Sequence, residues 1–216
     1  LQMLGTITNH KVLYVSGEES AGQVRLRAQR IQAPLDTISL FSETQLEELL
    51  HVLRSEKPHV VVVDSIQTLH SADLTSGAGS VAQMRECTQT LVDVAKQQGC
   101  ALFFVGHINK EGHIAGPKTI EHIVDTVLYF EQAGSGVRIV RAVKNRFGSV
   151  DEIGIFLMSE KGLQAVADPA GFFLSERKEK TLPPGIAFTA VIEGSRTFLV
   201  EIQALTIPAN KSGGGL

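Results

Sequence analysis

The stretch Val60-Val61-Val62-Val63-Asp64-Ser65 decides the fold class of this chain. An uninterrupted run of β-branched apolar residues is typical of a strand that is buried on both faces of a parallel sheet. Similar short apolar runs occur at residues 12–15 and 101–105. Because parallel strands need long crossover connections, we expect helices between these runs.

Amphipathic helices are indicated between the runs. Apolar residues recur every three or four positions over 24–31, 46–53 and 81–94. Ser42 with Gln45, and Ser80 with Gln83, have the spacing of capping boxes and predict helix starts. The sequence therefore predicts an α/β fold, with a mostly parallel sheet and helices on both of its faces.

The later part of the chain has a different pattern. Strand-like runs at 124–130, 137–143, 153–158 and 163–166 are separated by short turns with glycine, so we expect antiparallel strands at one edge of the sheet. We expect a core domain over 1–167 and a proline-rich, charged linker over 168–185. A hairpin that turns at 193–196 would open a truncated second domain over 186–216.

Composition narrows the function classes. Lys and Arg total 20 against 23 Asp and Glu, which gives a net charge of -3 and no general attraction for nucleic acid. No apolar run approaches the roughly 20 residues of a membrane-spanning helix, and no signal-peptide pattern opens the sequence, so we expect a cytoplasmic protein without membrane contact. Cys87 and Cys100 fall in apolar patterns where a small hydrophobic side chain fits.

Polar residues follow each of the three buried runs. Glu18 and Glu19 follow the first, Asp64 and Ser65 the second, and His107 the third. Taken singly, acidic residues also suit a helix N-terminus, a strand-terminal Asp also suits a turn, and the histidine also suits a loop. Together they predict a phosphoryl-transfer site with a general base, a carboxylate for Mg²⁺ and a polar γ-phosphate sensor, since ligands of open α/β sheets bind at this edge.

One part of such a site is absent from the sequence. The phosphate-binding pattern G-x-x-x-x-G-K-[ST] does not occur. Residues 1–9 have the spacing of a helix end, so we expect the phosphate loop upstream of Leu1 and take the chain as a piece of a longer protein. Without that loop we expect poor nucleotide binding.

Two loops and a set of cations are candidates for contact with a partner. The loops 70–80 and 110–118 are polar and rich in glycine, and Lys110, Lys118 and Arg141 are the candidate DNA contacts. Two flexible surface loops would show the same composition. Lys144 and Arg146 lie at a predicted turn, from which they would reach the phosphate site of a neighbouring subunit as arginine fingers do. A hairpin exposed to solvent would have the same sequence pattern.

Several segments resemble the RadA (also Sms) family of bacterial DNA repair proteins, which are RecA-like ATPases. In chain order they are 17–20, 63–67, 79–83, 106–107, 115–118 and 144–148. The last, Lys144-Asn145-Arg146-Phe147-Gly148, is the most specific of them.

The resemblance implies a fold, cofactors and partners. It implies a RecA-like core that hydrolyses ATP with Mg²⁺, forms homo-oligomers, as hexameric rings, on single-stranded DNA and promotes branch migration of branched recombination intermediates beside a recombinase filament. Zn²⁺ would be bound only by an N-terminal four-cysteine finger, which this sequence lacks. The hairpin near the end would begin a Lon-protease-like domain that serves as a scaffold.

The resemblance also implies residue roles. Glu18 matches the catalytic glutamate, with Glu19 as a neighbour that would share its task, and Asp64 matches the Walker B aspartate. His107 takes the sensor position. Lys144 and Arg146 would act across the subunit interface or toward DNA.

Two other function classes fit the same residues. One is a RecA-fold ATPase that binds a protein partner in place of DNA. The other is a non-catalytic assembly module, which the modest charge and the absent phosphate loop favour.

Overall fold

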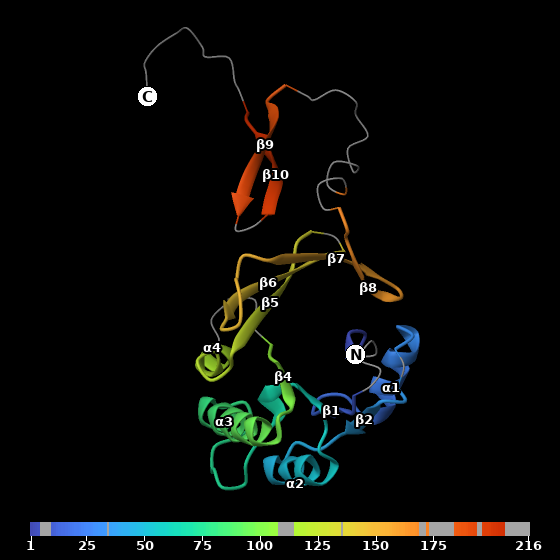
Figure 1. Cartoon of the computed structure of the whole chain (residues 1–216), viewed down its shortest axis with the longest axis vertical. Helices are drawn as coiled ribbons and strands as arrows, with labels where there is room; N and C mark the ends of the chain where they lie inside the picture. The colour runs from blue at the N-terminus through green and yellow to red at the C-terminus, as the bar shows by residue number, and fades with distance from the viewer. Residues whose placement is uncertain are drawn as a thin grey trace. The chain divides into compact units, whose positions relative to one another are not determined.

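The computed structural model describes residues 1–4, 10–33, 35–107, 115–134, 136–168, 172, 184–193 and 196–205. Figure 1 shows the helices and strands in chain order, and the chain divides into two units. The first comprises Leu1–Val127, Lys144–Phe147 and Met158–Leu163, and the second comprises Leu128–Val143, Gly148–Leu157 and Gln164–Leu216. Each unit is described by itself.

A parallel sheet of order β2-β1-β3-β4 forms the centre of the first unit. The strands are β1 (Val12–Ser16), β2 (Ile38–Phe41), β3 (Val60–Asp64) and β4 (Ala101–Val105). In the register of the sheet, Ser16 lies opposite Asp64, and Asp64 lies opposite Val105. The carboxyl ends of β1, β3 and β4 therefore meet at one edge, which confirms the predicted parallel α/β fold.

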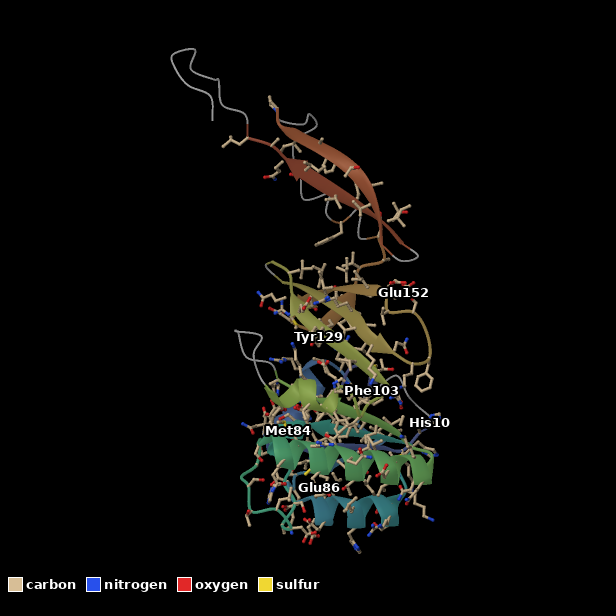
Figure 2. All side chains as sticks on the ribbon, turned by 90° about the vertical axis from the view of Figure 1, so that its left-hand side faces the viewer. His10, Met84, Glu86, Phe103, Tyr129 and Glu152 are labelled. Carbon is tan, nitrogen blue, oxygen red and sulfur yellow. The ribbon has the colours of Figure 1, made fainter. Side chains whose placement is uncertain are left out.

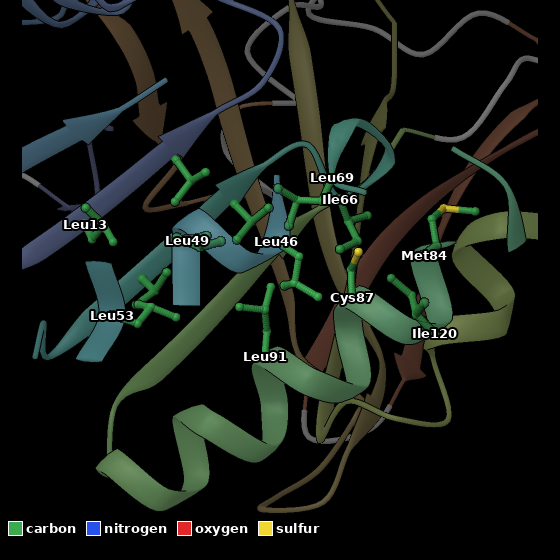
Figure 3. Packing of buried hydrophobic residues seen from close by; sticks show 13 residues of the cluster. Leu13, Leu46, Leu49, Leu53, Ile66, Leu69, Met84, Cys87, Leu91 and Ile120 are labelled. Atoms are coloured by element: carbon green, nitrogen blue, oxygen red, sulfur yellow. The ribbon is translucent and has the colours of Figure 1, made fainter. Parts of the chain in front are cut away.

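Helices cover both faces of this sheet. Alternate side chains of β3 therefore pack against helices on opposite faces. Val61 and Val63 belong to one core cluster with Leu49 of α2 (Leu46–Glu56) and Leu91 of α3 (Val81–Gln98). Figure 3 shows Leu49 and Leu91 among the buried side chains of this cluster. Val62 belongs to the cluster on the other face, beside α1 (Ala21–Arg30). On α3, Met84 is buried whereas Glu86 is exposed (Figure 2), so one side of the helix faces the core.

The helix ends agree only in part with the predicted capping boxes. Ser80 caps α3, because its side chain accepts a hydrogen bond from the Gln83 amide. The prediction for Ser42 is wrong: α2 begins after Gln45 and has no side-chain cap. Instead, the Leu46 amide donates to the His70 carbonyl at 2.9 Å, so a segment distant in sequence satisfies this helix start.

Two short helical segments lie near the carboxyl edge of the sheet. The 3-10 helix η2 (Ile66–Thr68) follows β3 directly. Helix α4 (Ala115–Ile120) occupies the end of the segment 110–118, which the sequence predicted as a loop. Residues 108–114, including Lys110, lie outside the described part of the chain.

The antiparallel strands form a sheet of their own. Its order is β5-β6-β7-β8. The strands are β5 (Thr126–Gln132), β6 (Val137–Asn145), β7 (Ile153–Ser159) and β8 (Gly162–Ala165). Strands β6 and β7 are antiparallel, with Arg138 opposite Phe156. The expected antiparallel strands are therefore present. The prediction that they extend one edge of the parallel sheet is wrong, because within the described residues they form a separate sheet.

The predicted hairpin is confirmed. Strands β9 (Ile186–Glu193) and β10 (Arg196–Gln203) are antiparallel, with Arg196 opposite Glu193. Most of the expected linker 168–185 lies outside the described residues, and the domain boundaries stay a prediction. No helix in the described ranges is long and apolar enough to cross a membrane.

Candidate functional site

The carboxyl edge of the parallel sheet brings together polar residues from the ends of three strands. Glu18 follows β1, Ser65 follows β3 and His107 follows β4. The Ser65 hydroxyl donates to Glu18 Oε1 at 2.6 Å, and His107 Nε2 lies 3.4 Å from the same oxygen. The Glu18 side chain is 47% exposed, so it remains accessible to water. The structure thus brings Glu18, Ser65 and His107 together.

A second group of side chains surrounds Asp64. The Tyr14 hydroxyl donates a hydrogen bond to Asp64 Oδ2. Arg27 Nη2 donates to the Tyr14 oxygen at 3.0 Å and lies 3.7 Å from Asp64 Oδ2. Arg27 Nη1 donates to Glu19 Oε1 at 3.0 Å. One guanidinium therefore joins both acidic positions, Glu19 and Asp64.

Sequence reasoning missed Tyr14 and Arg27. Tyr14 lies opposite Val62 in the register, two positions before Asp64, so it shares the sheet face of the Asp64 side chain. Helix α1 packs on this face through Val24 and brings Arg27 to the same place. Two features of the sequence could have indicated these residues. Tyr14 places a hydroxyl within a buried apolar run, and Arg27 lies next to the apolar stripe of α1.

Burial governs the protonation of Tyr14, whose exposed fraction is 3%. Desolvation raises the pKa of the phenol, and the hydrogen bond to Asp64 raises it further. The phenol is therefore a hydrogen-bond donor at neutral pH.

The turn between β1 and α1 is held from several sides. The Gly17 amide donates to the Asp64 carbonyl at 2.9 Å, and a Cβ at this position would overlap the Thr68 side chain. The Ser16 hydroxyl donates to the Glu19 carbonyl at 2.7 Å. Gln67 on η2 also donates to the His107 carbonyl at 3.0 Å, which ties the ends of β3 and β4. The acidic residues are thus presented by a fixed backbone.

A cavity of about 480 Å³ adjoins Asp64, which is large enough for a small ligand. Its lining includes Tyr14, Arg27, Asp64, Phe103 and Met158.

Comparison with known proteins shows the family to which the chain belongs. Residues 2–113 match the family model described as AAA domain. The DNA repair protein RadA of Listeria monocytogenes is 54% identical over 204 residues, which cover 94% of this chain and 44% of that protein. The chain belongs to the RadA family of AAA-domain proteins.

Other RadA proteins agree with this assignment. The DNA repair protein RadA of Treponema pallidum is 48% identical over 212 residues, covering 98% of this chain and 46% of that protein. The DNA repair protein RadA of Bacillus subtilis is 50% identical over 204 residues, covering 94% of this chain and 44% of that protein. The chain therefore spans a little under half the length of these relatives.

The carboxylates at this sheet edge fit a magnesium ion. Mg²⁺ usually keeps several waters and takes one or two carboxylates together with phosphate oxygens. Among the described residues, no group of three or more His, Cys, Asp or Glu is arranged to hold a metal ion. Glu19 Oε2 is buried and has no hydrogen-bond partner in the described part of the chain. An additional polar partner would satisfy that oxygen.

The cations of the RadA pentapeptide lie in contacts within the first unit. Lys144 Nζ donates to the Glu121 carbonyl at 2.6 Å and to the Val124 carbonyl at 2.7 Å, just after α4. Arg146 Nη1 lies 3.0 Å from Asp125 Oδ1. Their roles toward a neighbouring subunit or DNA stay predictions.

The candidate DNA contacts are separate from these residues. In the second unit, Arg141 makes hydrogen bonds of 3.1 and 2.9 Å to Glu131 and lies over the Tyr129 ring. Lys118 on α4 is exposed, and Lys110 lies outside the described residues.

The segment 71–76 has an internal anchor, unlike a freely flexible loop. Gln83 on α3 is 1% exposed, and its Oε1 accepts from the Ser71 amide at 2.8 Å. Its Nε2 donates to the carbonyls of Ser71, Leu74 and Ser76 at 3.1, 3.3 and 2.9 Å. The predicted partner-facing loop thus has a fixed backbone at its base.

Proposed function

We propose that this segment supplies catalytic residues to an ATP hydrolase of DNA repair, with Mg²⁺ and ATP as cofactors. The observation that carries the proposal is that the carboxyl ends of β1, β3 and β4 share one sheet edge, where Asp64 ends β3 and Glu18 lies 3.4 Å from His107. The RadA names of the relatives support the link to DNA repair.

Glu18 is the residue that we assign to orient and deprotonate the attacking water. Its carboxylate is accessible and is held by the Ser65 hydroxyl at 2.6 Å. Glu19 is less suited to this role because Arg27 binds its Oε1. Glu19 is therefore assigned to shape the site rather than to take the proton.

Asp64 is the residue that would hold Mg²⁺ through water. The bound ion would neutralise charge on the β- and γ-phosphates during transfer. Ser65 holds Glu18 in place, and His107, 3.4 Å from Glu18, is assigned to sense the γ-phosphate. The Gln67 contact gives His107 a fixed backbone from which to act.

The finer parts of the proposal concern assembly and DNA. We propose a hexameric ring that acts in the cytoplasm on single-stranded DNA, with a recombinase filament, to move branched recombination intermediates. Lys110, Lys118 and Arg141 would contact DNA. Lys144 and Arg146 would act across the ring interface, which requires them to exchange their present partners for phosphate oxygens.

A charge-neutral substitution tests the assignment of Glu18. In an intact RadA protein that contains this segment, Glu18→Gln keeps the hydrogen-bonding shape but removes the base. We expect ATP still to bind, while hydrolysis falls by about 10²- to 10⁴-fold, the usual contribution of a general base. Phosphate release and binding of a fluorescent ATP analogue measure the two effects.

Glu19→Gln is the matched control, since it removes the same charge one residue away. A much smaller loss is expected there. Wild-type hydrolysis in Glu18→Gln would remove Glu18 from its role, and equal losses in both variants would leave the choice of Glu18 over Glu19 without support.

A further inference from the structure

Asp64 is held through one of its two carboxylate oxygens. Among the described residues, the contacts of this carboxylate involve Oδ2, which accepts from Tyr14 and lies 3.7 Å from Arg27. Oδ1 is the oxygen that remains to meet a metal-bound water. Two groups from β1 and α1 therefore limit the rotation of a carboxylate on β3.

We propose that Tyr14 and Arg27 are positioning residues for the magnesium carboxylate Asp64. The inference rests on the proposed function, because it concerns how the metal ligand of that site is oriented. Mg²⁺ demands near-ideal octahedral geometry, so a carboxylate whose rotation is restricted binds it better than a freely rotating one.

Burial distinguishes Tyr14 from an incidental neighbour. Its ring belongs to the apolar cluster on the α1 face, and a phenylalanine would fill that space without a polar atom. A buried tyrosine hydroxyl needs a partner, and here that partner is Asp64. The hydroxyl thus has a definable effect on the carboxylate beyond the packing of the ring.

Arg27 links the Tyr14–Asp64 pair to Glu19. Its two terminal nitrogens bind different groups, Glu19 Oε1 at 3.0 Å and the Tyr14 hydroxyl at 3.0 Å. A lysine carries the same charge but lacks the planar fork that makes both contacts at once. Arg27→Lys therefore separates the effect of geometry from that of charge.

The first test measures the Mg²⁺ dependence of nucleotide binding and hydrolysis in an intact RadA protein that contains this segment. We expect Tyr14→Phe to raise the half-saturating Mg²⁺ concentration about fivefold, the equivalent of one typical hydrogen bond. We expect Arg27→Lys to raise it as well. Hydrolysis at saturating Mg²⁺ should fall much less, and the melting temperature should change little.

Two positions outside this hydrogen-bonded group provide matched controls. Tyr129→Phe removes a hydroxyl from the second unit, and Arg25→Lys changes an exposed arginine on α1. Both should keep the wild-type Mg²⁺ dependence. An unchanged Mg²⁺ dependence in both Tyr14→Phe and Arg27→Lys, whatever their stability, would overturn the positioning role.

A second test does not depend on hydrolysis. The chain has no tryptophan and two tyrosines, so Tyr14 is its only tyrosine in a Tyr129→Phe background, and excitation beyond the phenylalanine absorption selects its emission. A hydrogen bond to a carboxylate quenches phenol emission, and we expect Asp64→Asn to increase the emission of this chain. Unaltered emission would show that the Tyr14–Asp64 contact is absent and would sink the proposal. Loss of the Glu18 assignment alone would leave this result intact.

Discussion

Glu47 illustrates at the scale of a single residue how a local contact sets pH dependence. Its Oε1 accepts from the Ser71 hydroxyl at 2.6 Å and from the Ala72 amide at 3.3 Å. The hydrogen bond from Ser71 lowers the pKa of the Glu47 carboxyl below its ordinary value. The ionised form therefore binds the folded segment more strongly than the protonated form does.

The sign of the effect on stability follows from this direction. Because the pKa of Glu47 is lower in the folded state than in the unfolded state, its ionised carboxylate stabilises the fold at pH values above about 4.3, the ordinary pKa of glutamate. This contribution is lost as the pH falls through the folded-state pKa. Glu47→Gln removes the titration but keeps an acceptor oxygen. We expect the wild type to be more stable near neutral pH, and the difference from Glu47→Gln to shrink below about pH 4.

Thermal unfolding of this chain across that pH range provides the measurement. Glu48→Gln, at the exposed neighbouring position, serves as the control and should show no comparable pH-dependent difference. A constant gap between wild type and Glu47→Gln down to pH 3 would contradict the assignment of the Ser71 contact.

At the scale of elements, Gln83 connects helix α3 to the segment 71–76. Its amide satisfies one backbone amide and three carbonyls of that segment. Gln83→Met keeps the length of the side chain but leaves these groups without a partner. We expect a loss of about 1–3 kcal/mol in the free energy of unfolding, together with faster amide exchange at Ser71.

Gln89 on the same helix gives the matched control. It is exposed, and its amide binds the Asp93 side chain, so Gln89→Met should have a small effect. Equal destabilisation by both variants would show that the loss reflects the helix and not the anchored segment.

The parallel strands and their helices could be predicted because apolar runs and periodicity report burial directly. The same reasoning predicted Glu18, Asp64 and His107, since the carboxyl ends of neighbouring parallel strands share an edge. It failed for the start of α2, where His70, distant in sequence, supplies the hydrogen bond. Tyr14 could not be predicted from the sequence, because its role depends on which sheet face α1 covers.

At the scale of the whole molecule, charge bears on the proposed contact with DNA. The net charge is -3, and the cations Arg141, Lys144 and Arg146 all have partners within the chain. The DNA contact that we propose involves the three cations Lys110, Lys118 and Arg141, and Lys118 is exposed. Each phosphate contact to a single strand contributes about -0.7 to the slope of log affinity against log salt.

We expect ATP hydrolysis by an intact RadA protein containing this segment to be stimulated by single-stranded DNA at low salt. Because few contacts are involved, the stimulation should weaken with a shallow slope of about -2 as salt rises. Lys118→Gln should weaken DNA binding and make the slope shallower by about 0.7. Lys96→Gln, an exposed lysine of α3, should leave both unchanged.

Titrations of DNA-stimulated phosphate release between about 50 and 200 mM salt measure these slopes. Equal slopes for Lys118→Gln and the wild type would remove Lys118 from the DNA interface. Hydrolysis that does not respond to DNA even at the lowest salt would instead favour an ATPase that acts on a protein partner, because phosphate contacts are strongest under that condition.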